Sequence, residues 1–147
     1  MDCLGKLMYV EPNVESLDPK LIVTTSCRFF SLDLYTCQKE DAVFANLYSI
    51  KMEKSDCTVD GLVAWFDVEF RERLSSVVTF TTSPYNTSTH WKQTIFYIDG
   101  SYALDKGDEL YGSIAIRKNK NHHRELEMKV SFNCKDPDGV QFDEKCV

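Results

Sequence analysis

An imidazole and an indole stand next to each other in the run Thr89-His90-Trp91-Lys92-Gln93-Thr94. A histidine side chain, with an unperturbed pKa of about 6.5, changes charge near neutrality, and a tryptophan offers a broad apolar face that can hold a cation. His90 and Trp91 could therefore border a pocket for a cationic substrate. The alternative, which is the more common situation for such a pair taken alone, is a core-facing strand residue at Trp91 and a solvated loop residue at His90.

Two elements must hold His90 and Trp91 in position. One is the turn Ser83-Pro84-Tyr85-Asn86, which precedes them in the sequence, and the other is a strand that begins directly after them. From about Leu21 onward, apolar and polar residues alternate with a period of two, which predicts strands. The clearest runs put on one face Phe66, Val68 and Phe70; Leu110, Gly112, Ile114 and Ile116; and Leu126, Met128, Val130 and Phe132. Several such strands predict a mainly β chain folded as a sandwich or barrel.

Turn residues separate these runs. They occur at Ser83-Pro84, Asp99-Gly100, Lys106-Gly107, 118–123 and Asp136-Pro137-Asp138-Gly139. The last of them predicts a hairpin that joins the two terminal strands.

The first 19 residues differ from the rest. Leu4, Leu7 and Met8 follow helical spacing over one or two turns, and Pro12 and Pro19 stop any continuation. We expect a short amphipathic segment followed by an extended tether.

The composition is that of one soluble domain of 147 residues, without an apolar run of the roughly 18 residues that a membrane span needs. A net charge of −6 and a pI near 5.0 oppose binding to nucleic acid. The start of the sequence lacks the pattern of a secretory signal, so we expect a reducing compartment in which the six cysteines are free thiols. For the same reason, we expect that Asn86-Thr87-Ser88 matches the N-glycosylation acceptor pattern by chance.

Other chemistries find little support. His122-His123 lacks a third metal ligand, and a hydrolase built on Ser83, His90 and Asp67 lacks a nucleophile elbow. The six glycines are too far apart to form a cofactor-binding turn. Four acidic candidates are best explained as strand or loop surface, namely Glu40, Asp41, Glu69 and Glu72.

The surroundings of His90 and Trp91 resemble the C-terminal barrel of the protein arginine methyltransferases. The resemblance rests on the runs Phe80-Thr81-Thr82-Ser83-Pro84, Thr89 to Phe96, Trp65 to Phe70 and Gly107 to Gly112, and it extends to Glu11-Pro12, Asp18-Pro19, Asp33-Leu34-Tyr35-Thr36 and Lys118-Asn119. It implies an antiparallel β-barrel or sandwich-like domain of about eight to nine strands with a short N-terminal helical arm segment. It also implies that one strand runs through Asp60-Gly61, with a bulge or kink there.

By this resemblance, residues 1–19 form part of a dimerisation arm, with contacts at Leu4, Leu7, Met8 and Tyr9, and residues 20–147 form the substrate-binding barrel. An N-terminal segment folded back on its own domain is the alternative. Thr89, His90 and Trp91 are implied to line the arginine pocket, with His90 positioning substrate and Thr89 shaping the loop. The full enzyme is implied to be a homo-oligomer, cytoplasmic or nuclear, that methylates arginine-containing proteins with S-adenosylmethionine.

Two functional hypotheses follow. In the first, the chain is the substrate-positioning and dimerisation portion of a type I protein arginine methyltransferase, binds no cofactor or metal itself and is inactive alone. In the second, it is a stand-alone protein-interaction module that does not catalyse.

Overall fold

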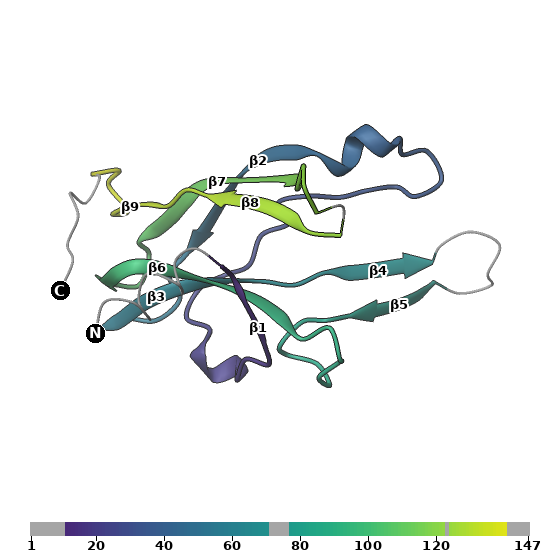
Figure 1. Cartoon of the computed structure of the whole chain (residues 1–147). Coiled ribbons are helices and arrows are strands. Elements are labelled where there is room, and N and C mark those ends of the chain that lie inside the picture. The colour runs from purple at the N-terminus through teal and green to yellow at the C-terminus, as the bar shows by residue number, and fades with distance from the viewer. Residues whose placement is uncertain (1–10, 71–76, 123, 141–147) are drawn as a thin grey trace. The chain divides into compact units, whose positions relative to one another are not determined.

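The computed structural model describes residues 11–70, 77–122 and 124–140, and within them the chain is mainly β (Figure 1). Two short 3-10 helices are present, η1 (Pro19–Leu21) and η2 (Lys39–Ala42). The strands of the described residues are β1 (Asn13–Glu15), β2 (Phe44–Lys51), β3 (Cys57–Ala64), β4 (Asp67–Phe70), β5 (Val78–Thr81), β6 (Gln93–Leu104), β7 (Glu109–Lys118), β8 (Leu126–Val130) and β9 (Asn133–Lys135). The predicted mainly β class is confirmed.

The chain divides into two compact units. The first holds residues up to Ile22 together with Thr58–Ala103. It contains a sheet of order β1-β6-β3 and the two-stranded ribbon β4-β5, whose strands pair antiparallel (Figure 1). The Asp60-Gly61 pair lies within β3, so the expectation of a continuous strand there is confirmed. A Cβ atom at Gly61 would lie 2.8 Å from the Phe96 carbonyl oxygen, so the close approach of β6 requires glycine.

The second unit holds Val23–Cys57 and the described residues of Leu104–Lys145. Its sheet has the order β2-β7-β8, with β9 also paired to β7 (Figure 1). The period-two prediction for β7 is confirmed, because Leu110, Gly112 and Ile114 are all buried while their neighbours on the strand are less so. The main buried apolar side chains of this unit are Met52, Leu104, Leu110, Ile114 and Cys134.

Other alternating runs form strands but bury less than their pattern predicts. Leu126 and Met128 are 55% and 37% exposed on β8, and Phe66 and Phe70 are 44% and 52% exposed near and on β4. A period of two predicts which side chains share a face of the strand. It does not show whether another part of the protein covers the apolar face. The predicted strand from Trp65 to Phe70 also begins later than expected, at Asp67.

The turn expected at Asp99-Gly100 is wrong, because β6 continues through both residues. Gly100 has a φ of 91°, a conformation that glycine adopts without steric cost, so it serves as an irregularity inside a paired strand. The turns at Lys106-Gly107 and Asp136 to Gly139 are confirmed. The second strand of the expected terminal hairpin lies outside the described residues.

The segment from Ile22 to Val43 was expected to continue the strand pattern, but its only β pairing is the isolated bridge between Thr24 and Met52, and it also contains η2. The expected amphipathic segment with Leu4, Leu7 and Met8 lies outside the described residues, and so does Tyr9, the fourth implied contact of the arm. The expected tether is extended as predicted but is not free, since β1 pairs antiparallel with β6 from Asn13 opposite Ile95 to Glu15 opposite Gln93. The predicted domain boundary between residues 19 and 20 stays a prediction.

The buried thiol of Cys134 links stability to alkaline pH. Burial, with the Asp108 charge as a smaller cause, raises the pKa of Cys134 from 9.0 to about 11. Because the folded pKa is above the unfolded one, stability is unaffected below pH 9 and falls as the pH rises through 9 to 11. We expect the free energy of unfolding in urea to fall by about 1 kcal/mol between pH 8 and 10 through this group.

A Cys134→Ser variant is the control for that titration. It should be less stable at pH 7, because a hydroxyl replaces a buried thiol, but its stability should fall less between pH 8 and 10. An equal fall in both proteins would assign the alkaline loss to other groups.

Candidate functional site

The segment between β5 and β6 carries His90 and Trp91 at the end of two consecutive turns. In the first turn, the N–H of Asn86 donates to the Ser83 carbonyl at 3.1 Å. In the second, the N–H of Lys92 donates to the Thr89 carbonyl at 3.1 Å, which makes His90 and Trp91 its two central residues. Lys92 then adopts a φ of 54°, a left-handed conformation that is unusual for a residue with a Cβ atom. The turn therefore holds both rings outward at the start of β6.

The base of this loop is built from buried polar side chains. Gln93 is 3% exposed, and its Nε2 donates to the Thr82 carbonyl at 2.8 Å. Thr82 is 2% exposed, and its hydroxyl accepts from the N–H and donates to the carbonyl of Phe66, each at 3.0 Å. Since buried polar groups destabilise a fold unless they are paired, these bonds fix the two ends of the loop to each other and to the residue before β4.

The N-terminal segment is attached to the same base. The N–H of Leu17 donates to Gln93 Oε1 at 2.9 Å. The hydroxyls of Ser16 and Ser88 lie 2.9 Å apart. Gln93 thus uses both ends of its amide, one on the segment after β1 and the other on the loop.

Three aromatic rings meet beside the turn, and we call Phe66, Phe80 and Trp91 the aromatic triad. The Trp91 ring stacks on Phe80 with centroids 5.7 Å apart, and it meets the edge of Phe66 at 6.0 Å. Phe66 and Phe80 make an edge contact at 6.1 Å. The His90 ring lies 3.9 Å from the Trp91 ring, tilted by 35°. Such contacts restrict the indole more than an isolated surface tryptophan.

The triad and the imidazole remain accessible to solvent. Trp91 is 49% exposed, and His90 is also exposed. The interpretation of Trp91 as a core-facing strand residue is therefore wrong, because Trp91 precedes β6 and lies in a turn. An exposed aromatic face next to an imidazole can contact a cationic side chain or another protein surface.

Thr89 contributes through its backbone. Its carbonyl closes the second turn, whereas its Oγ1 is buried without a hydrogen-bond partner within the described residues. The structure therefore brings Thr89, His90 and Trp91 together in one turn.

Among the described residues, the side chains considered for a hydrolase or a metal site are not arranged for that chemistry. The Asp67 carboxylate accepts from the Thr81 hydroxyl, and the Ser83 hydroxyl accepts from the N–H of Tyr85, so both side chains bond to residues other than His90. Within the described ranges, no three His, Cys, Asp or Glu side chains gather as a metal site. Four cysteines of these ranges are free thiols, Cys27, Cys37, Cys57 and Cys134. Among the described residues, no helix has the length and apolar character to span a membrane.

The sequence analysis did not identify Gln93 and Thr82 as parts of the site. Both lie within quoted runs, yet their types carry no chemistry of interest, and their partners are far away along the chain. The only available signal was a glutamine at the first position of an apolar strand, where buried side chains are rarely polar.

Comparison with known proteins identifies the family. The sequence model of the arginine methyltransferase oligomerization subdomain matches residues 1–137. The chain is 36% identical to protein arginine N-methyltransferase 8-B of Danio rerio over 135 residues, which is 92% of this chain and 32% of that protein. It is 35% identical to protein arginine N-methyltransferase 1 of Schizosaccharomyces pombe over 136 residues, 91% of this chain and 39% of the relative. The chain therefore spans about a third to two fifths of these relatives.

Solved structures share the fold. One match is a chain of the Trypanosoma brucei protein arginine methyltransferase 1 enzyme–prozyme heterotetrameric complex with AdoHcy. It has a TM-score of 0.84 and 24% sequence identity, and the match covers 95% of this chain and 44% of that chain. Protein arginine methyltransferase 10 of Arabidopsis thaliana matches with a TM-score of 0.83 and 22% identity, over 90% and 40%. Because the family match covers nearly the whole sequence, this chain belongs to the arginine methyltransferase oligomerization subdomain family.

Proposed function

We propose that this chain is the oligomerisation and substrate-positioning portion of a protein arginine methyltransferase, an enzyme that transfers a methyl group from S-adenosylmethionine to arginine side chains of proteins. The observation that carries the proposal is the family match over residues 1–137. A type I enzyme with the asymmetric product, in the cytoplasm or nucleus, belongs to the same proposal. The isolated chain is proposed to bind without catalysing.

His90 and Trp91 are proposed to form one wall of the arginine pocket. A guanidinium group stays protonated at neutral pH and stacks on aromatic faces. The exposed indole, supported by Phe66 and Phe80, offers such a face beside the imidazole. These groups hold and orient a side chain, since geometry on the scale of an ångström controls the rate of group transfer. Thr89 shapes the turn that presents them.

His90→Ala and Trp91→Ala test this role in the complete methyltransferase polypeptide that carries this subdomain. We expect kcat/KM for an arginine peptide to fall about tenfold with each substitution, because the substrate loses one wall of its pocket. Steady-state kinetics that separate kcat from KM, with thermal unfolding beside them, measure this. Thr87→Ala, at an exposed position of the same loop, is the control. Unchanged kinetics in both variants would make the loop purely structural.

Residues 1–19 are proposed to belong to a dimerisation arm that contacts a second subunit through Leu4, Leu7, Met8 and Tyr9. The pairing of β1 with β6 and the bond from Leu17 to Gln93 support a fixed attachment of the end of this arm. A homo-oligomer and arginine-containing protein substrates are the proposed partners.

The described residues do not fit S-adenosylmethionine. A cofactor of this kind is commonly bound by a glycine-rich turn between a strand and a helix. Here Gly61, Gly100 and Gly112 lie inside strands, whereas Gly107 and Gly139 lie in turns next to strands. Any cofactor site is therefore proposed to be formed by residues outside this chain.

Titration calorimetry of the purified chain with S-adenosylmethionine checks that assignment. We expect no heat of binding at cofactor concentrations up to the millimolar range, because no described element can seat the nucleotide. Binding with a dissociation constant in the micromolar range would contradict the proposal that the cofactor site is formed by residues outside this chain.

A further inference from the structure

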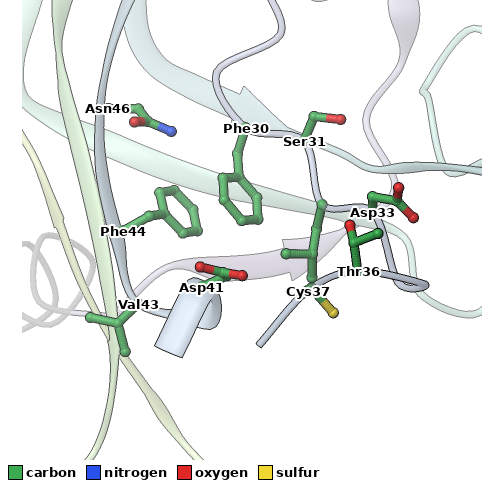
Figure 2. Close-up of a pocket in the computed structure, with 10 residues that line it drawn as sticks. Phe30, Ser31, Asp33, Thr36, Cys37, Asp41, Val43, Phe44 and Asn46 are labelled. Carbon is green, nitrogen blue, oxygen red and sulfur yellow. The ribbon is translucent and has the colours of Figure 1, made fainter. Parts of the chain in front are cut away.

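A hollow in the second unit is lined by residues with no role in the proposed function. Its volume is about 350 Å³, which is within the range of small ligand sites. Figure 2 shows the side chains around it, which come from the segment before η2, from η2 itself and from the start of β2. The lining residues are Phe30, Ser31, Leu32, Asp33, Thr36, Cys37, Asp41, Val43, Phe44 and Asn46.

Local hydrogen bonds hold the walls of this hollow in place. Asp33 closes a turn, because its carboxylate accepts from the N–H of Tyr35 and its carbonyl accepts from the N–H of Cys37 at 2.8 Å. Asp41 caps η2, with Oδ2 accepting from the N–H of Gln38 at 2.8 Å. Asn46 on β2 donates to the Phe29 carbonyl at 2.8 Å, which attaches the preceding segment to the sheet. The site is thus formed before a ligand arrives, which lowers the entropy cost of binding.

The chemistry of the lining favours a flat cation. The rings of Phe30 and Phe44 stack in parallel, with centroids 3.8 Å apart and 5° between their planes. In Figure 2 the Asp41 carboxylate lies below these two rings. Asp33 adds a second carboxylate, and none of the lining residues is Lys or Arg. An aromatic face next to a carboxylate attracts positive charge.

The rim of the hollow indicates that the cation belongs to a protein. Leu32 and Val43 in the lining are 37% and 54% exposed, and the neighbouring Leu34 and Tyr35 are 75% and 73% exposed. Exposed apolar side chains gathered around a polar centre are typical of protein contacts. The net charge of −6 complements a basic segment.

We propose that this hollow binds the guanidinium group of an arginine presented by a basic protein segment. A guanidinium can stack its plane on a phenyl ring while its N–H edge donates to a carboxylate, which a compact, strongly hydrated ammonium cannot do equally well. The inference goes beyond the proposed function, because every lining residue belongs to the second unit and the His90 loop belongs to the first.

The test is a titration of the ¹⁵N-labelled chain with an end-blocked Gly-Arg-Gly peptide, followed by residue-resolved NMR shifts. We expect shifts at residues 30–46 with a dissociation constant of about 1 mM. The matched citrulline peptide, which is neutral and of similar shape, should bind about fivefold more weakly.

Three variants separate the effect of the Asp41 charge and of the Phe30 ring from an effect on the fold. Asp41→Asn keeps a side chain that can cap η2 but removes the charge, so it should weaken binding about fivefold. Glu40→Gln, one residue earlier on η2 and outside the lining, should bind like the wild type. Phe30→Leu removes the ring that stacks on Phe44 and should also weaken binding, with a native circular dichroism spectrum showing that the fold persists.

Three results would overturn the inference. They are equal binding of the arginine and citrulline peptides, equal binding by Asp41→Asn and Glu40→Gln, or shifts confined to residues 82–92. The last result would leave the proposed function of the His90 loop intact, and failure of the His90 and Trp91 variants to alter kinetics would leave this site intact.

Discussion

Replacement of Gly112 by alanine is expected to destabilise the chain by about 4 kcal/mol, which approaches the whole stability of a small domain. Gly112 lies on β7 opposite Tyr48 of β2. A Cβ atom there would lie 2.0 Å from the Ser131 carbonyl oxygen, 2.7 Å from the Ser131 carbonyl carbon and 3.0 Å from the Tyr48 hydroxyl. Atoms cannot approach so closely, so the backbone after β8 would have to move.

That backbone is held by several bonds, so its displacement is costly. The Tyr48 hydroxyl donates to the Ser131 carbonyl at 2.8 Å, and burial raises the pKa of this tyrosine, which keeps the donating proton in place. The N–H of Ser131 donates to the Ser113 carbonyl at 2.8 Å, and its Oγ accepts from the N–H of Ser113 at 2.8 Å. Alanine at Gly112 would disturb these bonds together, and leaving such groups unpaired costs about 1 to 3 kcal/mol each.

Urea unfolding followed by circular dichroism measures the effect of Gly112→Ala. Gly139→Ala is the matched control, because Gly139 has a φ of 86° but nothing within 4 Å of the added atom, so only about 1 kcal/mol should be lost. Tyr48→Phe, which removes one bond to Ser131 without adding an atom, should lose about 1 kcal/mol. If Gly112→Ala and Gly139→Ala prove equally stable, the close approach of Ser131 to β7 is wrong.

The sequence predicts the features of this fold that are local. Alternation places Leu110, Gly112 and Ile114 on the buried face of β7, because successive side chains of a strand point to opposite faces whatever lies beyond. It cannot give the reason for a glycine at 112, which depends on Ser131, a residue brought close only by the pairing of β7 with β8.

Local turn chemistry fails where pairing overrides it. Asp99-Gly100 has the composition of a turn, yet it lies within β6, because hydrogen bonds along a long strand outweigh the preference of two residues. Sequence reasoning assigned Asp41 to strand or loop surface, and Asp41 is exposed, but it gave no indication of the stacked rings of Phe30 and Phe44 that line the same hollow.

The candidate site likewise has a local part that the sequence predicts and a supporting part that depends on distant residues. The sequence predicts a turn at Ser83 to Asn86, followed by an imidazole and an indole at a strand start, and the structure has this arrangement. The second turn, from Thr89 to Lys92, was not predicted. The support beneath it joins Gln93 to Leu17, a residue 76 positions away in the chain. Such a contact has no local signature, since neither residue changes the propensity of its own segment.

Replacement of Gln93 by leucine is the second substitution with a large expected effect, a loss of about 3 kcal/mol in the free energy of unfolding. Leucine has a similar volume but no polar atoms, so the N–H of Leu17 and the carbonyl of Thr82 would lose their partners at a position that is 3% exposed. Each buried group left unpaired costs about 1 to 3 kcal/mol. Urea unfolding measures the loss, and Thr87→Leu, at an exposed position of the same loop, should lose less than about 1 kcal/mol.

A second readout separates support of the loop from general stabilisation. In a Trp65→Phe background, Trp91 is the only tryptophan of the chain, and it reports on the aromatic triad. Because Gln93 joins the loop to the segment after β1, its replacement should release the turn and make Trp91 more accessible to acrylamide quenching under conditions in which the protein is folded. Lower stability with unchanged quenching would mean that Gln93 stabilises the sheet without positioning His90 and Trp91.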